Sequence, residues 1–122
     1  MTVDLTGARL YLVARAELAR GRLADLVPEL AAAGVDLLQL REKEMEAGEL
    51  LRVAGPILDA CRAYGLPFVL NDRPDVAVVL GADGVHVGQN DLPVTAVRPF
   101  VGKGIVGLST HRPEEVDAAL AS

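Results

Sequence analysis

The sequence has one cysteine, no tryptophan, and only two tyrosines and two phenylalanines among its 122 residues. The single cysteine, Cys61, excludes a disulfide framework within the chain, and the absence of a Cys-x-x-Cys pair removes the usual zinc patterns. So few aromatic residues cannot build a base-stacking platform, and the net charge of -5 comes with no run of basic residues. We therefore expect no nucleic-acid partner.

Long apolar runs are also missing. No stretch approaches the length of a membrane span, and the first residues, MTVDLTGARLYLV, lack a basic region followed by an apolar core. We therefore expect a cytoplasmic protein with no membrane partner. The chain is 51% apolar and 24% charged, which is typical of one globular domain, and we assign residues 1–122 to a single domain.

Short apolar runs alternate with segments of helical periodicity along the whole chain. The runs predict strands at 9–13, 35–40, 68–70, 84–87 and 105–109. The periodic segments predict helices at 23–33, 49–64 and 76–80, another after Pro93, and a last one at 113–121. Strands that alternate with helices indicate a parallel sheet with right-handed crossovers.

The number of units limits the possible architectures. A closed barrel of eight βα units needs about 250 residues, so five units predict an α/β fold of the (β/α)8 TIM-barrel type, truncated to a half-barrel. A flattened doubly wound sheet is the alternative. Either sheet would leave its first and last strands unpaired, and two copies could pair across these open edges. We therefore expect a homodimer.

Two aspartates follow neighbouring predicted strands. Asp72 comes directly after the strand at 68–70, and Asp91 follows the strand at 84–87, nineteen positions later. Because the carboxyl ends of parallel strands lie on one side of a sheet, the two carboxylates should meet there. Converging carboxylates suit a hard divalent cation such as Mg²⁺. The residues alone favour a simpler alternative, in which each aspartate only caps a helix.

A second polar group follows the strand at 35–40. Arg41 offers a planar fork to phosphate oxygens, Lys43 offers a compact charge, and Gln39 carries both a donor and an acceptor. Together they suit a phosphorylated ligand with a neutral polar ring. The alternative is that Arg41 and Lys43 are solvated neighbours of Glu42 and Glu44.

Three further residues have ordinary interpretations. His86 lies within an apolar strand and is expected to be a hydrogen-bonded histidine of the core or rim. His111, just beyond Ser109 at a strand end, is a somewhat better candidate for a direct role. Cys61 lies on the apolar stripe of its helix and is expected only to pack.

Three motifs carry a resemblance to a known family. LQLREK at 38–43, LNDRPDVAVVLGADGVHVGQNDLP at 70–93 and GLSTH at 107–111 resemble thiamine phosphate synthase, a (β/α)8-barrel enzyme, in the order and spacing of that family. The resemblance implies a magnesium-dependent transferase of thiamine biosynthesis. It would join hydroxymethylpyrimidine diphosphate to thiazole phosphate and release diphosphate.

The resemblance also implies roles for individual residues. Asp72 and Asp91 match the magnesium ligands of the family. The positions that match contacts to the pyrimidine diphosphate are Gln39, Arg41, Lys43, Asn71 and Ser109. Arg41 and Lys43 would in addition assist catalysis by stabilising the departing diphosphate.

The family's last three strands, with the loops that hold thiazole phosphate, have no counterpart in these 122 residues. We therefore expect little or no synthase turnover from this chain alone. Two alternatives stay open: a relative of the thiazole tautomerases, which do not need the paired carboxylates, and a non-catalytic half-barrel fragment. The joint presence of Asn71, Asp72 and Asp91 favours the synthase.

Overall fold

The structure is a computed structural model that describes residues 3–122. It contains one parallel sheet in which every strand pairs with its neighbour in the sequence, in the order β1-β2-β3-β4-β5. The strands are β1 (Tyr11–Ala14), β2 (Leu37–Leu40), β3 (Phe68–Asn71), β4 (Gly84–Val87) and β5 (Ile105–Leu108). The helices are α1 (Leu18–Gly21), α2 (Leu23–Ala32), α3 (Ala47–Ala63), α4 (Pro74–Leu80), α5 (Val94–Val101) and α6 (Pro113–Ala121). The predicted α/β fold with five parallel βα units is confirmed.

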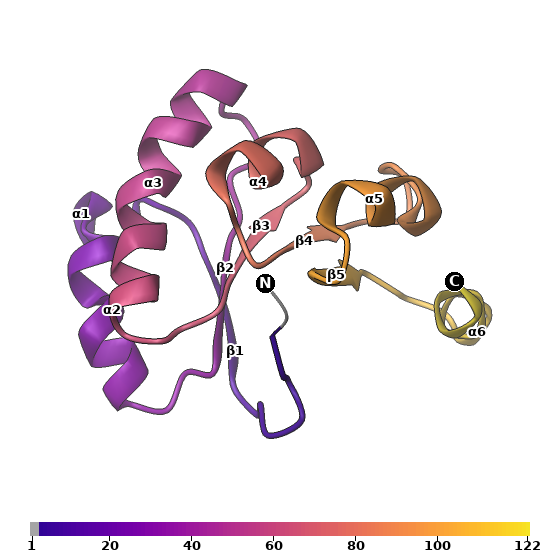
Figure 1. The fold of residues 1–122 in the computed structure, drawn as a ribbon, viewed down its shortest axis with the longest axis horizontal. Coiled ribbons are helices and arrows are strands. Elements are labelled where there is room, and N and C mark those ends of the chain that lie inside the picture. The colour runs from indigo at the N-terminus through magenta and orange to yellow at the C-terminus, as the bar shows by residue number, and fades with distance from the viewer. Residues whose placement is uncertain (1–2) are drawn as a thin grey trace.

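Helices α2 to α5 cover the outer side of the curved sheet (Figure 1). Alternate residues of the strands point toward these helices and join the buried core, among them Leu38, Phe68, Leu70 and Val85. The helices contribute their periodic apolar stripes, and Cys61 of α3 is fully buried in this core. The core therefore lies between the sheet and its helices, as in the outer layer of a βα barrel.

The other alternate residues of the strands line the inner, concave side. The register places Gln39 beside Val69, and it places His86 between Asn71 and Gly107. Three polar side chains, Gln39, Asn71 and His86, thus lie on neighbouring strands of one face. Polar side chains gathered on the inner face of the strands are candidates for a ligand site.

The structure differs from the sequence prediction near β1. The strand begins at Tyr11 because the backbone N–H groups of Arg9 and Leu10 donate to the Asp36 carboxylate, at 2.8 and 3.0 Å. Asp36 consequently precedes β2 instead of belonging to it. Helix α1 was not predicted, and its residues Ala19 and Arg20 have left-handed backbone angles, with φ of +53° and +61°. Such a turn has no apolar periodicity that a sequence pattern could reveal.

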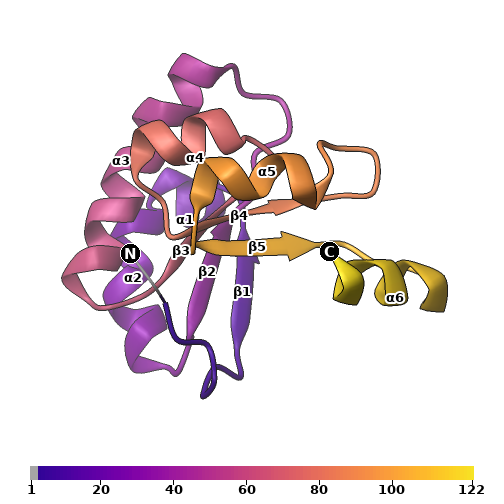
Figure 2. The same cartoon turned by 45° about the vertical axis from the view of Figure 1, so that its right-hand side comes forward.

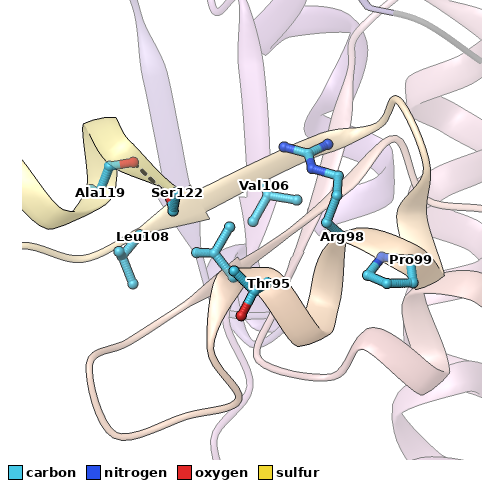
Figure 3. Close-up of a pocket in the computed structure, with 8 residues that line it drawn as sticks. Thr95, Arg98, Pro99, Val106, Leu108, Ala119 and Ser122 are labelled. Carbon is cyan, nitrogen blue, oxygen red and sulfur yellow. Dashed lines mark hydrogen bonds between the residues drawn. The ribbon is translucent and has the colours of Figure 1, made fainter.

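The sheet is open at β1 and at β5, so the half-barrel is not closed within the described residues. Tyr11 and Val13 on β1 are 42% and 48% exposed. Helix α6 stands apart from the sheet (Figure 2) and buries no residue. A pocket of about 540 Å³ opens between α5, β5 and α6 (Figure 3) and is lined by Val94, Thr95, Arg98, Pro99, Val106, Leu108, Ala119 and Ser122.

No helix within residues 3–122 is both long enough and apolar enough to cross a membrane.

Candidate active site

The candidate site lies at the carboxyl ends of the strands, where the loops that follow them converge. Asp72 directly follows β3 and adopts a left-handed backbone angle, with φ of +53°. Its backbone N–H donates to the carbonyl oxygen of His86 at 2.7 Å, which ties this turn to β4. Aspartate is among the few non-glycine residues that tolerate this conformation. The turn holds the Asp72 side chain at the rim.

The carboxyl groups of Asp72 and Asp91 lie close enough together to influence each other's protonation. Asp91 is held in the loop after β4, where its Oδ2 accepts a hydrogen bond from the Gly88 N–H at 2.7 Å. Burial raises the pKa of Asp72, and the Asp91 charge and hydrogen bond raise it further, while the charges of Lys43 and Arg73 act in the opposite direction. Two carboxylates so close together favour a shared proton or a shared cation.

The interpretation of both aspartates as helix caps is wrong. The N-cap residue of α4 is Arg73 and that of α5 is Pro93, and neither helix has a side-chain capping bond. The Asp72 carboxylate accepts no capping hydrogen bond from the first backbone N–H groups of α4. The Asp91 carboxylate instead accepts a hydrogen bond from the Gly88 N–H and holds that turn. The expected meeting of the two side chains is present in the structure.

The loop after β2 brings the basic residues to the same rim. Arg41 and Lys43 are exposed, and with Arg15 and Glu44 they line a shallow pocket of about 200 Å³. Within residues 3–122, neither Arg41 nor Lys43 forms an ion pair with a carboxylate. A partly open pocket lined by three cationic side chains can receive an anion.

Arg15 and the role of Glu42 were not predicted from the sequence. Arg15 immediately follows β1, so its position at a strand end was the available signal, but the predicted strand ended too early to reveal it. Glu42 is not a partner of Arg41 or Lys43, because its Oε1 accepts a hydrogen bond from the Ala16 N–H at 2.6 Å. This bond joins the loop after β1 to the loop after β2.

Gln39 and Asn71 are buried on the concave face. The Gln39 Nε2 donates to the Tyr11 hydroxyl at 2.8 Å, which leaves its Oε1 available to a ligand. Burial raises the pKa of Tyr11, and the hydrogen bond with Gln39 lowers it by a smaller amount. The Asn71 Nδ2 is buried and has no hydrogen-bond partner among the described residues. A buried donor without a partner is costly, about 1–3 kcal/mol, so this amide is suited to an acceptor supplied by a ligand.

The two histidines have different surroundings. His86 Nε2 and Ser109 Oγ lie 2.8 Å apart, so His86 is a hydrogen-bonded histidine, as expected. Burial lowers its pKa, the Asp91 charge raises it, and the Lys43 charge lowers it. His111 lies just before α6, where its backbone N–H donates to the Glu115 carboxylate at 2.7 Å and its side chain is 74% exposed. The structure does not bring His111 to the paired carboxylates.

Comparison with known proteins identifies the family. A sequence model described as "Thiamine monophosphate synthase" matches residues 10–122. The chain belongs to the thiamine monophosphate synthase family. The resemblance inferred from the three motifs is therefore confirmed, and with it the relation to a transferase of thiamine biosynthesis.

Named relatives support this assignment. The thiamine-phosphate synthase of Arthrobacter sp. (strain FB24) is 45% identical over 119 residues, covering 97% of this chain and 50% of the relative. A thiamine-phosphate synthase of Thermus thermophilus is 50% identical over 96 residues, covering 79% of this chain and 46% of the relative. The 122-residue chain thus spans about half the length of the curated relatives it matches.

Solved structures agree with the fold. The thiamine phosphate pyrophosphorylase from Pyrococcus furiosus superimposes with a TM-score of 0.78 and 28% identity, covering 93% of this chain and 55% of that one. A dihydropteroate synthase from Xanthomonas albilineans gives a TM-score of 0.64 at 21% identity, which supports the fold alone. Both superpositions match about half of a longer chain.

The residues fit a magnesium ion of the kind that the family implies. Residues 3–122 contain no cluster of three or more histidine, cysteine, aspartate or glutamate side chains suited to a metal. Mg²⁺ usually takes only one or two protein carboxylates and completes its shell with water and phosphate oxygens. Asp72 and Asp91, which lie close together near Lys43, would supply this donor set.

Proposed function

We propose that this chain forms the part of a thiamine phosphate synthase site that binds hydroxymethylpyrimidine diphosphate. The observation that carries the proposal is the proximity of the Asp72 and Asp91 carboxyl groups at the ends of two paired parallel strands, on the rim that also bears Arg41 and Lys43. A bound diphosphate is stabilised by cations that neutralise its charge, and two neighbouring carboxylates are stabilised by a cation that neutralises theirs. One Mg²⁺ ion would satisfy both requirements, and it would neutralise charge on the departing diphosphate.

The residues of the chain itself would do the following work. Arg41 binds phosphate oxygens through its planar fork, and Lys43 adds a mobile positive charge near Asp72. Both side chains are free of ion pairs within the described part of the chain, so no bond has to be broken before they bind the diphosphate. As the bond from the pyrimidine methylene carbon to the diphosphate oxygen lengthens, these cations stabilise the growing negative charge.

The polar residues of the concave face would orient the pyrimidine. Gln39 keeps its Oε1 free for the amino group of the ring, since its Nε2 is already bonded to Tyr11. Asn71 offers its unpaired Nδ2 to an acceptor, and Ser109, which directly follows β5, offers a hydroxyl. Joining to thiazole phosphate forms the new bond at the methylene carbon, and diphosphate leaves with the bonding electron pair.

We propose that residues 1–122 by themselves bind the pyrimidine diphosphate but turn over slowly or not at all. We also propose a homodimer in the cytoplasm. The open strands β1 and β5 and the exposed Tyr11 and Val13 support self-association, since unpaired edges and exposed apolar residues are stabilised when they are covered.

Isothermal titration calorimetry tests the binding proposal. The wild-type chain should bind hydroxymethylpyrimidine diphosphate only when Mg²⁺ is present, and Asp72→Ala should abolish this binding. Asp75→Ala is the matched control, because Asp75 lies three residues away and pairs with Arg73 at 2.8 Å. Magnesium-independent binding, or equal loss in both variants, would contradict the proposal.

Turnover separates the remaining alternatives. Binding with magnesium but without formation of thiamine phosphate indicates half of a synthase site. Turnover at the rate of a full-length family member would contradict the expectation of impaired catalysis. No magnesium-dependent binding at all would leave the structural half-barrel as the better interpretation.

A further inference from the structure

His86 and Ser109 form a pair that the proposed function does not explain. His86 lies on β4, and Ser109 directly follows β5, with 2.8 Å between Nε2 and Oγ. The backbone of Ser109 is held separately, because its N–H donates to the Val87 carbonyl at 3.0 Å and its own carbonyl accepts from the Gln89 amide at 2.8 Å. Histidine and serine are therefore fixed relative to each other by two neighbouring strands.

Glycine at position 107 makes room for the imidazole. His86 and Gly107 are paired in the register of β4 and β5. A Cβ atom at position 107 would collide with the His86 Nδ1 and would lie 3.2 Å from both Cγ and Cε1. Any side chain at this position would displace the ring and break its contact with Ser109. The absence of a side chain therefore decides where the ring lies.

The burial of Nδ1 favours one tautomer of this histidine. Nδ1 is buried and has no hydrogen-bond partner among the described residues. A neutral imidazole carries one proton, on either Nδ1 or Nε2. A proton on Nδ1 would create a buried N–H without an acceptor, which is rarer in proteins than an acceptor without a donor. We therefore place the proton on Nε2, from which it would be donated to Ser109 Oγ.

We propose that His86 is a positioning residue, which donates from Nε2 to Ser109 Oγ and so leaves the serine proton available to an acceptor atom of the bound ligand. This inference rests on the proposed function, in which Ser109 contacts the pyrimidine diphosphate. With the opposite tautomer, Ser109 would donate its proton to the histidine and could only accept from the ligand. The tautomer of His86 thus selects a ligand atom that accepts a hydrogen bond.

Nuclear magnetic resonance of nitrogen-15 histidine tests the tautomer directly. The chain has only two histidines, His86 and His111, so a His111→Gln variant assigns both spectra. At pH 8, well above the ordinary histidine pKa of about 6.5, His86 should show a protonated Nε2 and an unprotonated Nδ1. A protonated Nδ1 in the ligand-free chain overturns the proposal.

Calorimetry with hydroxymethylpyrimidine diphosphate and Mg²⁺ tests the consequence for binding. His86→Leu and Ser109→Ala should each weaken binding by about tenfold, the size of one hydrogen bond. His86→Gln should bind more tightly than His86→Leu, because its amide can restore the donor. The double variant of His86→Leu and Ser109→Ala should be no weaker than either single variant, since His86 acts through Ser109.

A purely structural role for His86 gives a different result. In that case His86→Leu would weaken binding equally in the presence and in the absence of the Ser109 hydroxyl, and this outcome overturns the proposal. A wild-type chain that binds no pyrimidine diphosphate contradicts the proposed function instead. The histidine spectrum needs no ligand and decides the tautomer independently.

Discussion

Replacing Asp72 with asparagine should stabilise the ligand-free chain at neutral pH. The substitution keeps a side chain that tolerates the left-handed backbone at this position, and it removes one of two neighbouring negative charges. Two unit charges about 4 Å apart repel by about 1 kcal/mol in water and by about 4 kcal/mol at an effective dielectric constant near 20. Asp72 is only partly buried, so solvent screening favours the lower value. We expect the free energy of unfolding to rise by about 1 kcal/mol.

The pH dependence follows from the direction of the pKa change. The folded chain raises the pKa of Asp72, so protonation of this group favours the folded state. The repulsion is fully present above the raised pKa and is relieved as the pH falls toward the ordinary aspartate value of about 3.9. The advantage of Asp72→Asn over the wild type should therefore be largest near pH 7 and shrink toward pH 4.

Asp75→Asn is the matched control, because it should change stability in the opposite direction. Hydrogen bonds from Arg73, at 3.1 and 2.8 Å, lower the pKa of Asp75. A lowered pKa gives stability that is present above about pH 3.9 and is lost as the pH falls through the folded value. This pair lies at the surface, so its loss should cost only about 0.5 kcal/mol at pH 7.

Urea unfolding followed by circular dichroism, at several pH values and low ionic strength, measures both effects. Added Mg²⁺ should reverse the order of Asp72→Asn and wild type, because only the wild type keeps both carboxylates. At about 100 times its dissociation constant, a ligand adds about 2.7 kcal/mol to the stability of the state it binds. The two carboxylates do not interact as described if Asp72→Asn is no more stable than the wild type at pH 7. The same holds if the substitution raises the free energy of unfolding by the same amount at pH 4 as at pH 7.

Three further predictions concern the scaffold that supports the site. Gly84→Ala should destabilise the chain by about 3 kcal/mol or more in urea unfolding, because the new Cβ would lie 2.5 Å from the Ile105 Cβ and against its backbone. Gly55→Ala in α3, which meets nothing within 4 Å, should instead be stabilising by about 0.5–1 kcal/mol, and equal effects would contradict the contact. Asp83→Ala should cost about 2–3 kcal/mol in the same assay, since it removes the acceptor at 2.8 Å from the buried Phe68 N–H; a change below about 1 kcal/mol would refute that role. Burial raises the pKa of Cys61 to about 12, so Ellman's reagent should modify the thiol only at the rate of unfolding, and rapid labelling of the folded chain would disprove its burial.

Much of the site could be located from the sequence, because strand ends are marked by abrupt changes from apolar to polar residues. Parallel topology then requires Asp72 and Asp91 to lie at one rim, and in the structure their carboxyl groups are close enough for the Asp91 charge to raise the pKa of Asp72. Their role as magnesium ligands stays a prediction. The cap alternative could not be rejected from the sequence, because a cap and a ligand occupy the same position after a strand. Only the hydrogen bonds of the folded chain distinguish the two.

The amino-acid sequence by itself determined the order of the strands and of every helix except α1, the parallel sheet and the family, because periodicity and motif spacing are properties of the chain. The tertiary structure alone decided which side chains share a hydrogen bond. The contact of His86 with Ser109 depends on the register of β4 against β5 and on the missing side chain at Gly107. The Glu42 bond to Ala16 and the pocket around Arg15 likewise join loops that are distant in sequence. Such contacts arise from the packing of separate elements, and no local pattern encodes them.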